Sequence, residues 1–236
     1  MLELLRAEDR VATVVRVEPV ARDTFVYHLR LDAPIRFHPG QFFNLAVPDS
    51  GPRGERSYSV YSDPAAVPDL ELAIKLLEGG AASEFLRRSR AGDTFKLRGP
   101  FGGFTLVPDA EPVTFLATGT GLAPFRPMLE AAARAHDPRR FRLAFGVRDE
   151  PDLFGLEHLE RLRAALPDFD WTVCLSRAGP GWTGYRGRVT QLLAEEPGPP
   201  VGYFYLCGNG AMIEEARTFL KERGVDRKHI HAEKYY

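Results

Sequence analysis

The chain has 236 residues, of which 44% are hydrophobic and 27% are charged, and its formal net charge is -1. This composition is that of an ordinary globular protein, and it excludes a general electrostatic attraction to nucleic acid or to membranes. Cys174 and Cys207 form no Cys-x-x-Cys pair, so we expect no disulfide framework, no cysteine-ligated iron–sulfur cluster and no metal site. The amino terminus lacks a signal-peptide core and no apolar run reaches ~18 residues, which predicts a soluble, cytoplasmic protein.

The first hundred residues consist of short strands separated by Pro, Gly and Asp turns. Their residues are β-branched or aromatic and often alternate with polar ones. The expected strands are Val11–Val17, Thr24–Leu31, Gln41–Val47, Ser57–Tyr61, Leu70–Leu77 and Thr94–Leu97. A short helix is expected at Ser83–Arg88, with Ser83 near its amino-terminal cap. Six strands with one helical stretch indicate a β-barrel.

From residue 113 onward, strands alternate with helices. The expected strands are Val113–Ala117, Phe141–Val147, Phe169–Leu175 and Gly202–Cys207. Helices are expected near Phe154–Leu166, Val189–Ala194 and Ala211–Arg223. Such alternation indicates a parallel sheet covered on both faces, with ligands at the carboxyl ends of its strands. At the usual ~100 to 200 residues per domain, we expect two domains, residues 1–107 and 108–236.

A tight turn, Thr118-Gly-Thr-Gly121, follows the first strand of the second part. Its glycines permit the turn and let a phosphate approach the main chain. Pro124 and Pro127 suit the opening turn of a helix that Met128–Arg134 continues. Pro124 stands where a complete Gly-x-Gly-x-x-Gly motif has its third glycine, so a simple strand-to-helix connection remains the alternative.

A second candidate site is the segment Arg56-Ser-Tyr-Ser59. Strand geometry sends Arg56 and Tyr58 to one face and the two serines to the other. Arg56 suits a pyrophosphate, Tyr58 suits stacking on a planar ring, and Ser59 suits a hydrogen bond to that ring. Gly80-Ala-Ala-Ser83 opens a helix and offers N–H groups to the same pyrophosphate. A phosphate-bearing aromatic cofactor would explain both segments; a half-exposed strand is the alternative for the first.

Six segments occur in the order and spacing of the ferredoxin–NADP reductase family, which the chain resembles over nearly its whole length. They are Arg56-Ser-Tyr-Ser59, Gly80-Ala-Ala-Ser83, Gly99-Pro-Phe-Gly102, Thr118–Pro124, Cys207-Gly-Asn209 and His231–Tyr236. The resemblance implies a six-stranded antiparallel β-barrel that binds FAD. It also implies that a five-stranded parallel, Rossmann-like α/β domain follows and binds a nicotinamide dinucleotide.

The resemblance assigns one group of residues to noncovalently bound FAD. Ser59 would lie near the flavin nitrogen that accepts hydride, and Tyr235 would cover the flavin face on which nicotinamide must stack. Tyr236 would lie further out, against the adenine of FAD. The remaining FAD residues are Arg56, Tyr58, Ile74, Lys75 and Leu76, and the turn made of Gly80, Ala81, Ala82 and Ser83.

Another group is assigned to the nicotinamide nucleotide, with Thr118, Gly119, Thr120 and Gly121 around its pyrophosphate. By resemblance, Cys207 would lie beside the nicotinamide, with Glu233 as the nearby carboxylate. Outside this family, Cys207 would be a small buried residue and the last residues a frayed end. The proposed catalytic residues are thus Ser59, Cys207, Glu233 and Tyr235.

Arginines indicate which nicotinamide nucleotide is used. A carboxylate after the second parallel strand would mark NAD, but Arg148 stands there. Ser176 and Arg177 resemble the family's 2′-phosphate site, and Arg188 matches a second arginine of bacterial members. We therefore expect NADP, although three arginines could also form a solvated face.

The resemblance implies that NADPH passes a hydride to the flavin, which releases single electrons to ferredoxin or flavodoxin. Arginines that could steer such an acidic partner, or could be ordinary surface residues, are Arg36, Arg53, Arg87, Arg88 and Arg90. The expected protein is a monomer or homodimer. The alternatives are a reductase component of an oxygenase, a free-flavin reductase, and a non-catalytic electron-transfer subunit, which in the known case carries an added cysteine cluster.

Overall fold

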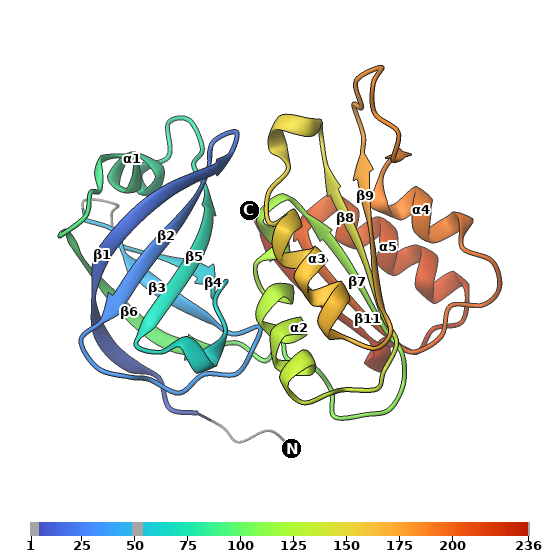
Figure 1. Cartoon of the computed structure of the whole chain (residues 1–236), viewed down its shortest axis with the longest axis horizontal. Coiled ribbons are helices and arrows are strands. Elements are labelled where there is room, and N and C mark those ends of the chain that lie inside the picture. The colour runs from blue at the N-terminus through green and yellow to red at the C-terminus, as the bar shows by residue number, and fades with distance from the viewer. Residues whose placement is uncertain (1–4, 49–53, 236) are drawn as a thin grey trace. The chain divides into compact units, whose positions relative to one another are not determined.

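A computed structural model of the chain describes residues 5–48 and 54–235 (Figure 1). The chain divides into two compact units, the first made of Met1–Leu106 and Ala123–Ala131, the second of Val107–Leu122 and Ala132–Tyr236. Each unit contains its own sheet and its own hydrophobic core. None of the helices in the described residues is long and apolar enough to cross a membrane.

The first unit is built on a six-stranded antiparallel sheet with the strand order β4-β3-β6-β1-β2-β5. Its strands are β1 (Glu8–Ala21), β2 (Thr24–Leu31), β3 (Phe42–Ala46), β4 (Glu55–Ser59), β5 (Asp69–Lys75) and β6 (Thr94–Phe101). The two outer strands meet at a seam, where Val60 pairs with Leu72 and the Tyr61 N–H donates to the Glu71 carbonyl over 2.8 Å. The seam closes the sheet into a barrel, which confirms the predicted fold.

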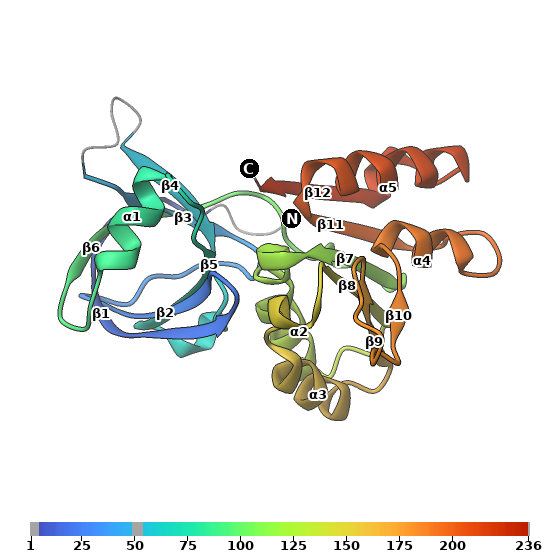
Figure 2. The same cartoon turned by 90° about the horizontal axis from the view of Figure 1, so that it is seen from above.

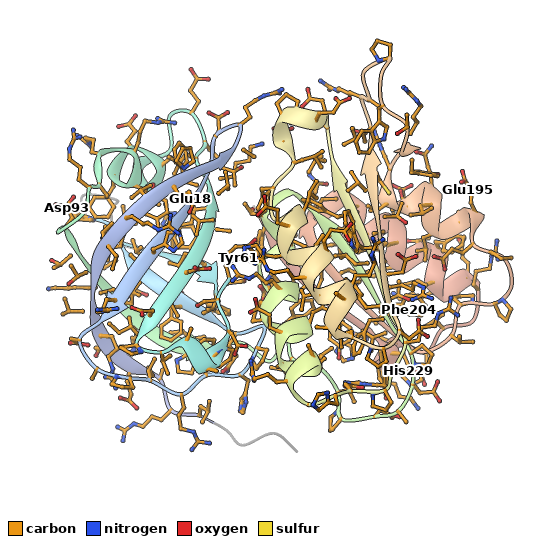
Figure 3. The ribbon with its side chains drawn as sticks, viewed as in Figure 1. Glu18, Tyr61, Asp93, Glu195, Phe204 and His229 are labelled. Atoms are coloured by element: carbon orange, nitrogen blue, oxygen red, sulfur yellow. The ribbon has the colours of Figure 1, made fainter. Side chains whose placement is uncertain are left out.

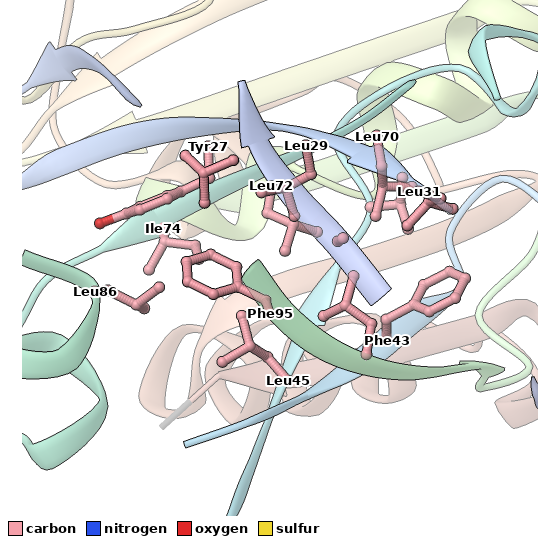
Figure 4. Close-up of a cluster of buried hydrophobic side chains, with 14 of the residues drawn as sticks. Tyr27, Leu29, Leu31, Phe43, Leu45, Leu70, Leu72, Ile74, Leu86 and Phe95 are labelled. Atoms are coloured by element: carbon pink, nitrogen blue, oxygen red, sulfur yellow. The ribbon is translucent and has the colours of Figure 1, made fainter. Parts of the chain in front are cut away.

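Alternating residues of the barrel strands fill its interior, as the close-up in Figure 4 shows. Tyr27, Phe43 and Phe95 are the largest of these side chains, and none is more than 2% exposed. Leu29 and Leu72 pack among them. Burial of one such side chain stabilises the fold by about 1.5 to 3 kcal/mol. A shift of one residue in the strand pairing would turn these side chains to the other face, so the period-two pattern of the sequence selects the register.

The helix expected at Ser83–Arg88 begins earlier, as α1 (Ala81–Arg88) with Gly80 at its cap. Ser83 is buried in the first turn, where its hydroxyl accepts a hydrogen bond from the Leu77 N–H over 2.8 Å. The prediction of Ser83 near the cap is therefore wrong, because its hydroxyl binds the preceding loop instead of its own helix. A 3₁₀ turn, η1 (Pro64–Ala66), is the other short helical element of the barrel.

A half-buried charge network lies on the side of β5 within the first unit. The Glu71 carboxylate accepts from the Arg126 guanidinium over 2.6 Å and lies 3.1 Å from His28 Nδ1. His28 Nε2 contacts Glu18, labelled in Figure 3, over 3.0 Å. Arg126 also lies over the Tyr61 ring, 4.4 Å from its centroid. Burial alone would raise the pKa of Glu71, but the His28 hydrogen bond and the Arg126 charge lower it to about 2.

We expect Glu71→Gln to destabilise the protein by about 2 kcal/mol at pH 7. The fall of the pKa from 4.5 to about 2 corresponds to about 3 kcal/mol, and screening at a side chain that is 24% exposed reduces this. A depressed carboxyl pKa stabilises the fold above the unfolded value, so the difference between variant and wild type should shrink between pH 5 and 2. Urea unfolding at several pH values measures it.

The matched control is Asp69→Asn, two residues away on the same strand. Asp69 pairs with Arg30 over 2.8 Å, but this side chain is 52% exposed. An exposed pair of this kind contributes about 0.5 kcal/mol. A pH-independent loss in Glu71→Gln would show that packing, and not charge, explains the effect.

The second unit contains a six-stranded parallel sheet with the strand order β10-β9-β8-β7-β11-β12. Its strands are β7 (Val113–Thr118), β8 (Phe141–Val147), β9 (Phe169–Leu175), β10 (Tyr185–Arg186), β11 (Tyr203–Asn209) and β12 (Ile230–Tyr235). The parallel α/β architecture is confirmed. The five expected strands become six because β10 adds two residues at one edge, too few for any periodic pattern in the sequence.

Helices cover both faces of this sheet, α3 (Leu156–Ala165) on one and α4 (Val189–Glu195) with α5 (Gly210–Glu222) on the other (Figure 2). Leu116 and Leu206 of the strands pack with Leu193 and Ile213 of these helices. The remaining helical elements are α2 (Phe125–Arg134), η2 (Gly119–Leu122), η3 (Glu150–Asp152) and η4 (Arg227–His229). The carboxyl ends of the strands are thereby left for ligands.

Candidate functional site

Strand β4 carries the Arg-x-Tyr-Ser segment with the alternation that the sequence predicts. Tyr58 is opposite Phe43 and packs against the barrel core, whereas the Ser57 hydroxyl donates to Asn44 Oδ1 over 2.7 Å on the other face. Burial raises the pKa of Tyr58 to about 12, despite the opposing charge of Arg56, so the phenol stays neutral. Ser59 is buried. A neutral, partly exposed ring next to a guanidinium is what a flavin with its pyrophosphate needs.

Arg56 is exposed, and its guanidinium donates to the Glu55 carbonyl over 2.8 Å. Within residues 5–48 and 54–235 it forms no ion pair with a carboxylate. An exposed arginine without a carboxylate partner among the described residues is able to bind a phosphate group.

The end of β5 offers main-chain groups at the seam. Ile74 is in register with Phe25 and the Leu76 N–H donates to the Asp23 carbonyl over 2.7 Å, so both turn their main chain towards β2. Since antiparallel pairing alternates sides, Lys75 turns its main chain the other way, as does Ala73. Of the three residues expected around the flavin, Lys75 is therefore the one oriented to bind through its main chain, and Ala73 shares that orientation.

The turn before α1 places N–H groups at the start of a short helix. Gly80 accepts from the Glu84 N–H over 2.9 Å, which leaves the N–H groups of Ala81, Ala82 and Ser83 at the helix start. Gly79 adopts a left-handed conformation with φ of +70°. This arrangement is suited to an anion, as expected from the sequence.

In the second unit, the turn after β7 interlocks with the end of β11. A Cβ on Gly121 would overlap the carbonyl oxygen of Cys207 and lie 2.5 Å from its carbonyl carbon. In return, the Thr118 hydroxyl accepts from the Asn209 N–H over 2.8 Å, and a Cβ on Gly208 would overlap that hydroxyl. The two glycine-containing motifs are therefore a single packed structure at the carboxyl ends of neighbouring parallel strands. The turn itself is the 3₁₀ element η2 and not the first turn of α2.

Cys207 is buried at the end of β11, in register with Ala117 and Glu233. Burial, followed by the charge of Glu233, raises the pKa of its thiol well above the usual value. A hydrogen bond with the Tyr235 side chain opposes this shift. The structure thus brings Cys207, Glu233 and Tyr235 together around a neutral thiol. Tyr236 lies outside the described residues.

Three exposed arginines lie at the carboxyl ends of β8, β9 and β10. The Arg177 N–H donates to the Arg148 carbonyl over 2.7 Å, so these two residues are neighbours. The Gly187 N–H donates to the Leu175 carbonyl over 3.0 Å, which brings Arg188 beside the same strand end. None of the three forms an ion pair with another described residue, and Ser176 is exposed among them. Arginines that pair with no described carboxylate and lie around a hydroxyl are suited to a phosphate monoester.

The arginines expected to meet a protein partner are all exposed where the structure describes them. Arg87 and Arg88 end α1, with Arg88 donating to the Glu84 carbonyl over 3.1 Å. Arg36 and Arg90 lie in loops, and Arg53 lies outside the described residues. Within the described residues, no group of His, Cys, Asp and Glu side chains could hold a metal ion.

Two side chains support the candidate site in ways that the sequence did not indicate, although Asn209 belongs to the expected Cys207-Gly-Asn209 segment. Asn209 joins the turn after β7 to α5, since its side chain accepts from the Ala211 N–H over 2.9 Å. Arg186 binds main-chain carbonyls of the loop that carries the arginine site. The sequence could not reveal this role of Arg186, because every residue has a main-chain carbonyl whatever its type.

Comparisons with known proteins agree with this geometry. Residues 11–106 match the oxidoreductase FAD-binding domain, and residues 115–218 match the oxidoreductase NAD-binding domain. Ferredoxin–NADP reductase B of Sorangium cellulosum is 36% identical over 98% of this chain and 100% of its own length. The electron transfer component of anthranilate 1,2-dioxygenase from Acinetobacter baylyi is 33% identical over 96% of this chain and 67% of its own length. The crystal structure of Amycolatopsis cytochrome P450 reductase GcoB superposes with a TM-score of 0.91 at 32% identity, covering 98% of this chain and 71% of that one.

Proposed function

The chain belongs to the ferredoxin–NADP reductase family of FAD-dependent oxidoreductases, and we propose that it transfers electrons between NADP(H) and ferredoxin or flavodoxin. The observation that carries this proposal is the interlocked pair of motifs around Gly121 and Cys207. It joins a phosphate-binding turn to the residues suited to the nicotinamide. We further propose that residues 1–107 form the FAD domain and residues 108–236 the NADP domain.

Two features of the first unit fit FAD. Arg56, which pairs with no described carboxylate, and the amino-terminal turn of α1 offer charge and N–H groups for its pyrophosphate. Tyr58 offers a neutral ring for the flavin, and the main chain of Lys75 faces the side of β5 away from β2. Ser59 would bind the reactive edge of the flavin. When bound, FAD accepts a hydride and returns its electrons one at a time.

The residues of the second unit orient the nicotinamide and do not react with it. The turn Thr118–Gly121 would bind the pyrophosphate, and the neutral Cys207 thiol would support the nicotinamide ring next to Glu233. A neutral thiol at this position leaves the nicotinamide without an adjacent negative sulfur, so hydride transfer meets no competing nucleophile. Arg148, Ser176, Arg177 and Arg188 would bind the 2′-phosphate, which favours NADP over NAD.

The direct test is to purify the protein and compare NADPH-dependent reduction of ferredoxin, flavodoxin, an oxygenase component and free flavin side by side. We expect a yellow protein that releases FAD on denaturation and reduces ferredoxin or flavodoxin fastest. A folded, colourless protein that takes up no flavin would reject the proposal.

The similarity to the anthranilate dioxygenase component favours a second candidate, a reductase that serves an oxygenase. Faster reduction of the oxygenase component than of ferredoxin and flavodoxin would select it. The cytoplasm is the proposed compartment, where the free thiols of Cys174 and Cys207 would stay reduced.

Removing the last two tyrosines should tighten nicotinamide binding. We propose that Tyr235 covers the flavin face and must leave before the nicotinamide can stack there, so its stacking energy of ~1 kcal/mol is subtracted from coenzyme affinity. Deletion of Tyr235 and Tyr236 should therefore improve affinity about fivefold for NADPH and by a larger factor for NADH. The deletion should also narrow the preference for NADPH over NADH. Turnover should become slower if the oxidised nucleotide then dissociates slowly. Coenzyme titration and stopped-flow kinetics measure these effects.

Tyr235→Phe is the matched control, since it keeps the ring and should retain most of the wild-type behaviour. A purely structural role for Tyr235 and Tyr236 predicts a different result of their deletion. In that case truncation would leave the flavin spectrum and the coenzyme affinity unchanged, and the stacking role would be rejected.

A further inference from the structure

The loop between β9 and β10 carries the proposed phosphate site at its two ends. Arg177 begins the loop directly after β9, and Arg188 follows β10 as the cap of α4. The loop projects beyond the end of β9 (Figure 1). It contains four glycines and one proline between these arginines, a composition that gives it little conformational preference of its own. Something else must hold Arg177 and Arg188 in position.

Arg186, the second residue of β10, supplies that support. Its guanidinium donates to the main-chain carbonyls of Gly179 over 3.0 Å, Pro180 over 3.1 Å and Trp182 over 2.6 Å, and more weakly to Ala178 over 3.4 Å. Among the described residues, Arg186 forms no ion pair with a carboxylate. Within the described residues, the Arg186 guanidinium therefore binds main-chain carbonyls of the loop and no acidic side chain.

Neighbouring residues anchor Arg186 to the rest of the unit. Tyr185 packs against the core beneath α4, and burial together with a hydrogen bond to Glu195, labelled in Figure 3, raises its pKa to about 12. The Trp182 indole N–H donates to the Tyr185 carbonyl over 3.1 Å, which ties the loop tip to the base of β10. A Cβ on Gly187 would lie 2.8 Å from atoms of both Tyr185 and Gln191, so the chain between Arg186 and Arg188 is closely packed.

We propose that Arg186 is a positioning residue for coenzyme selectivity: it braces the β9–β10 loop so that Arg177 and Arg188 are held ready for the 2′-phosphate of NADP. This inference rests on the proposed function of that arginine site. Arg186 itself is occupied by loop carbonyls and does not contact the phosphate. Its effect is to reduce the ordering that Arg177 and Arg188 would otherwise undergo on binding.

The test compares binding of 2′,5′-ADP and 5′-AMP to the purified holoenzyme. Arg186→Ala should weaken 2′,5′-ADP about tenfold, since two long side chains then have to be ordered on binding, and should leave 5′-AMP unchanged. In turnover, KM for NADPH should rise while kcat with saturating NADH stays constant. Hydrogen exchange of residues 176–188 should become faster, which reports the lost bracing independently of coenzyme.

Two further variants separate bracing from charge and from misfolding. Arg186→Lys keeps the positive charge but loses the planar fork that spans several carbonyls, so it should resemble Arg186→Ala. Arg163→Ala, an exposed arginine that pairs with Glu160 over 2.8 Å on α3, should behave as the wild type. If Arg186→Lys binds 2′,5′-ADP like the wild type, charge alone is responsible and the bracing role is overturned.

The result also distinguishes this inference from the function on which it rests. A wild-type enzyme that binds 2′,5′-ADP no better than 5′-AMP would refute the NADP site itself. A wild-type enzyme that prefers 2′,5′-ADP, with Arg186→Ala keeping that preference, would refute only the positioning role.

Discussion

Gly121→Ala should abolish most of the affinity for both nicotinamide nucleotides, by about a hundredfold. The added Cβ would overlap the Cys207 carbonyl oxygen and lie 2.8 Å from the Gly208 nitrogen, and main-chain atoms at strand ends cannot rotate away. The turn after β7 would have to move away from β11, which would displace the N–H groups proposed to bind the pyrophosphate. Such overpacking should also destabilise the protein by about 3 kcal/mol. Coenzyme titration and thermal unfolding measure the two effects.

Gly119→Ala is the matched control in the same turn. Gly119 has φ of +55°, but a Cβ there would meet nothing within 4 Å. Only the left-handed conformation is strained, at about 1 kcal/mol, so this variant should lose far less affinity. Equal losses in both variants would mean that backbone strain, and not the interlock with Cys207, governs the turn.

The second large effect is expected for coenzyme selectivity. Arg177→Ala and Arg188→Ala each remove a charge-assisted hydrogen bond to the proposed 2′-phosphate, worth ~1.5 kcal/mol at an exposed site. Each variant should raise KM for NADPH about tenfold and the double variant about a hundredfold. KM for NADH should stay nearly constant. Steady-state kinetics with both coenzymes over a range of salt concentrations measure this.

Arg217→Ala provides the control, because Arg217 is an arginine of α5 that contacts Glu214 over 3.5 Å, away from the strand ends. It should change neither KM. Equal losses for NADPH and NADH in Arg177→Ala would show that this arginine binds the shared pyrophosphate or supports the fold. In that case the preference for NADP would have to come from elsewhere.

Most of the fold could be predicted because apolar periodicity and tertiary packing agree. Thr24–Leu31 and Phe141–Val147 are strands of the same bounds in sequence and structure, since alternation or a continuous apolar run marks each of them. Of the two helix starts expected from the sequence, the opening at Gly80-Ala-Ala-Ser83 agrees with α1, whereas capping by Ser83 is wrong although this residue caps helices well by type. Only the folded loop shows that the Ser83 hydroxyl accepts a hydrogen bond from the Leu77 N–H.

In the candidate site, too, some features could be predicted from the sequence and others could not. Side-chain chemistry made Arg56, Tyr58 and the arginines at the strand ends candidates, because charge and ring type are visible in the sequence. Main-chain chemistry was invisible, as for Ala73 at the seam and the loop carbonyls that bind Arg186. The two-residue strand β10 was missed for a related reason, since its existence depends on its partner β9 and not on its own composition.

The seam of the barrel has a consequence for how the protein is produced. Among the described residues, the chain after β4 is joined to β5 there by the Val60–Leu72 bridge, the Tyr61–Glu71 hydrogen bond and a hydrogen bond from the Glu71 N–H to the Ser62 hydroxyl. Without flavin, this join should open first on warming and expose two strand edges that can pair with other chains. FAD, which we propose to bind beside this join, would stabilise the closed barrel by mass action. Riboflavin supplied during expression should therefore raise the yield of monodisperse protein, and stripping the flavin should promote aggregation.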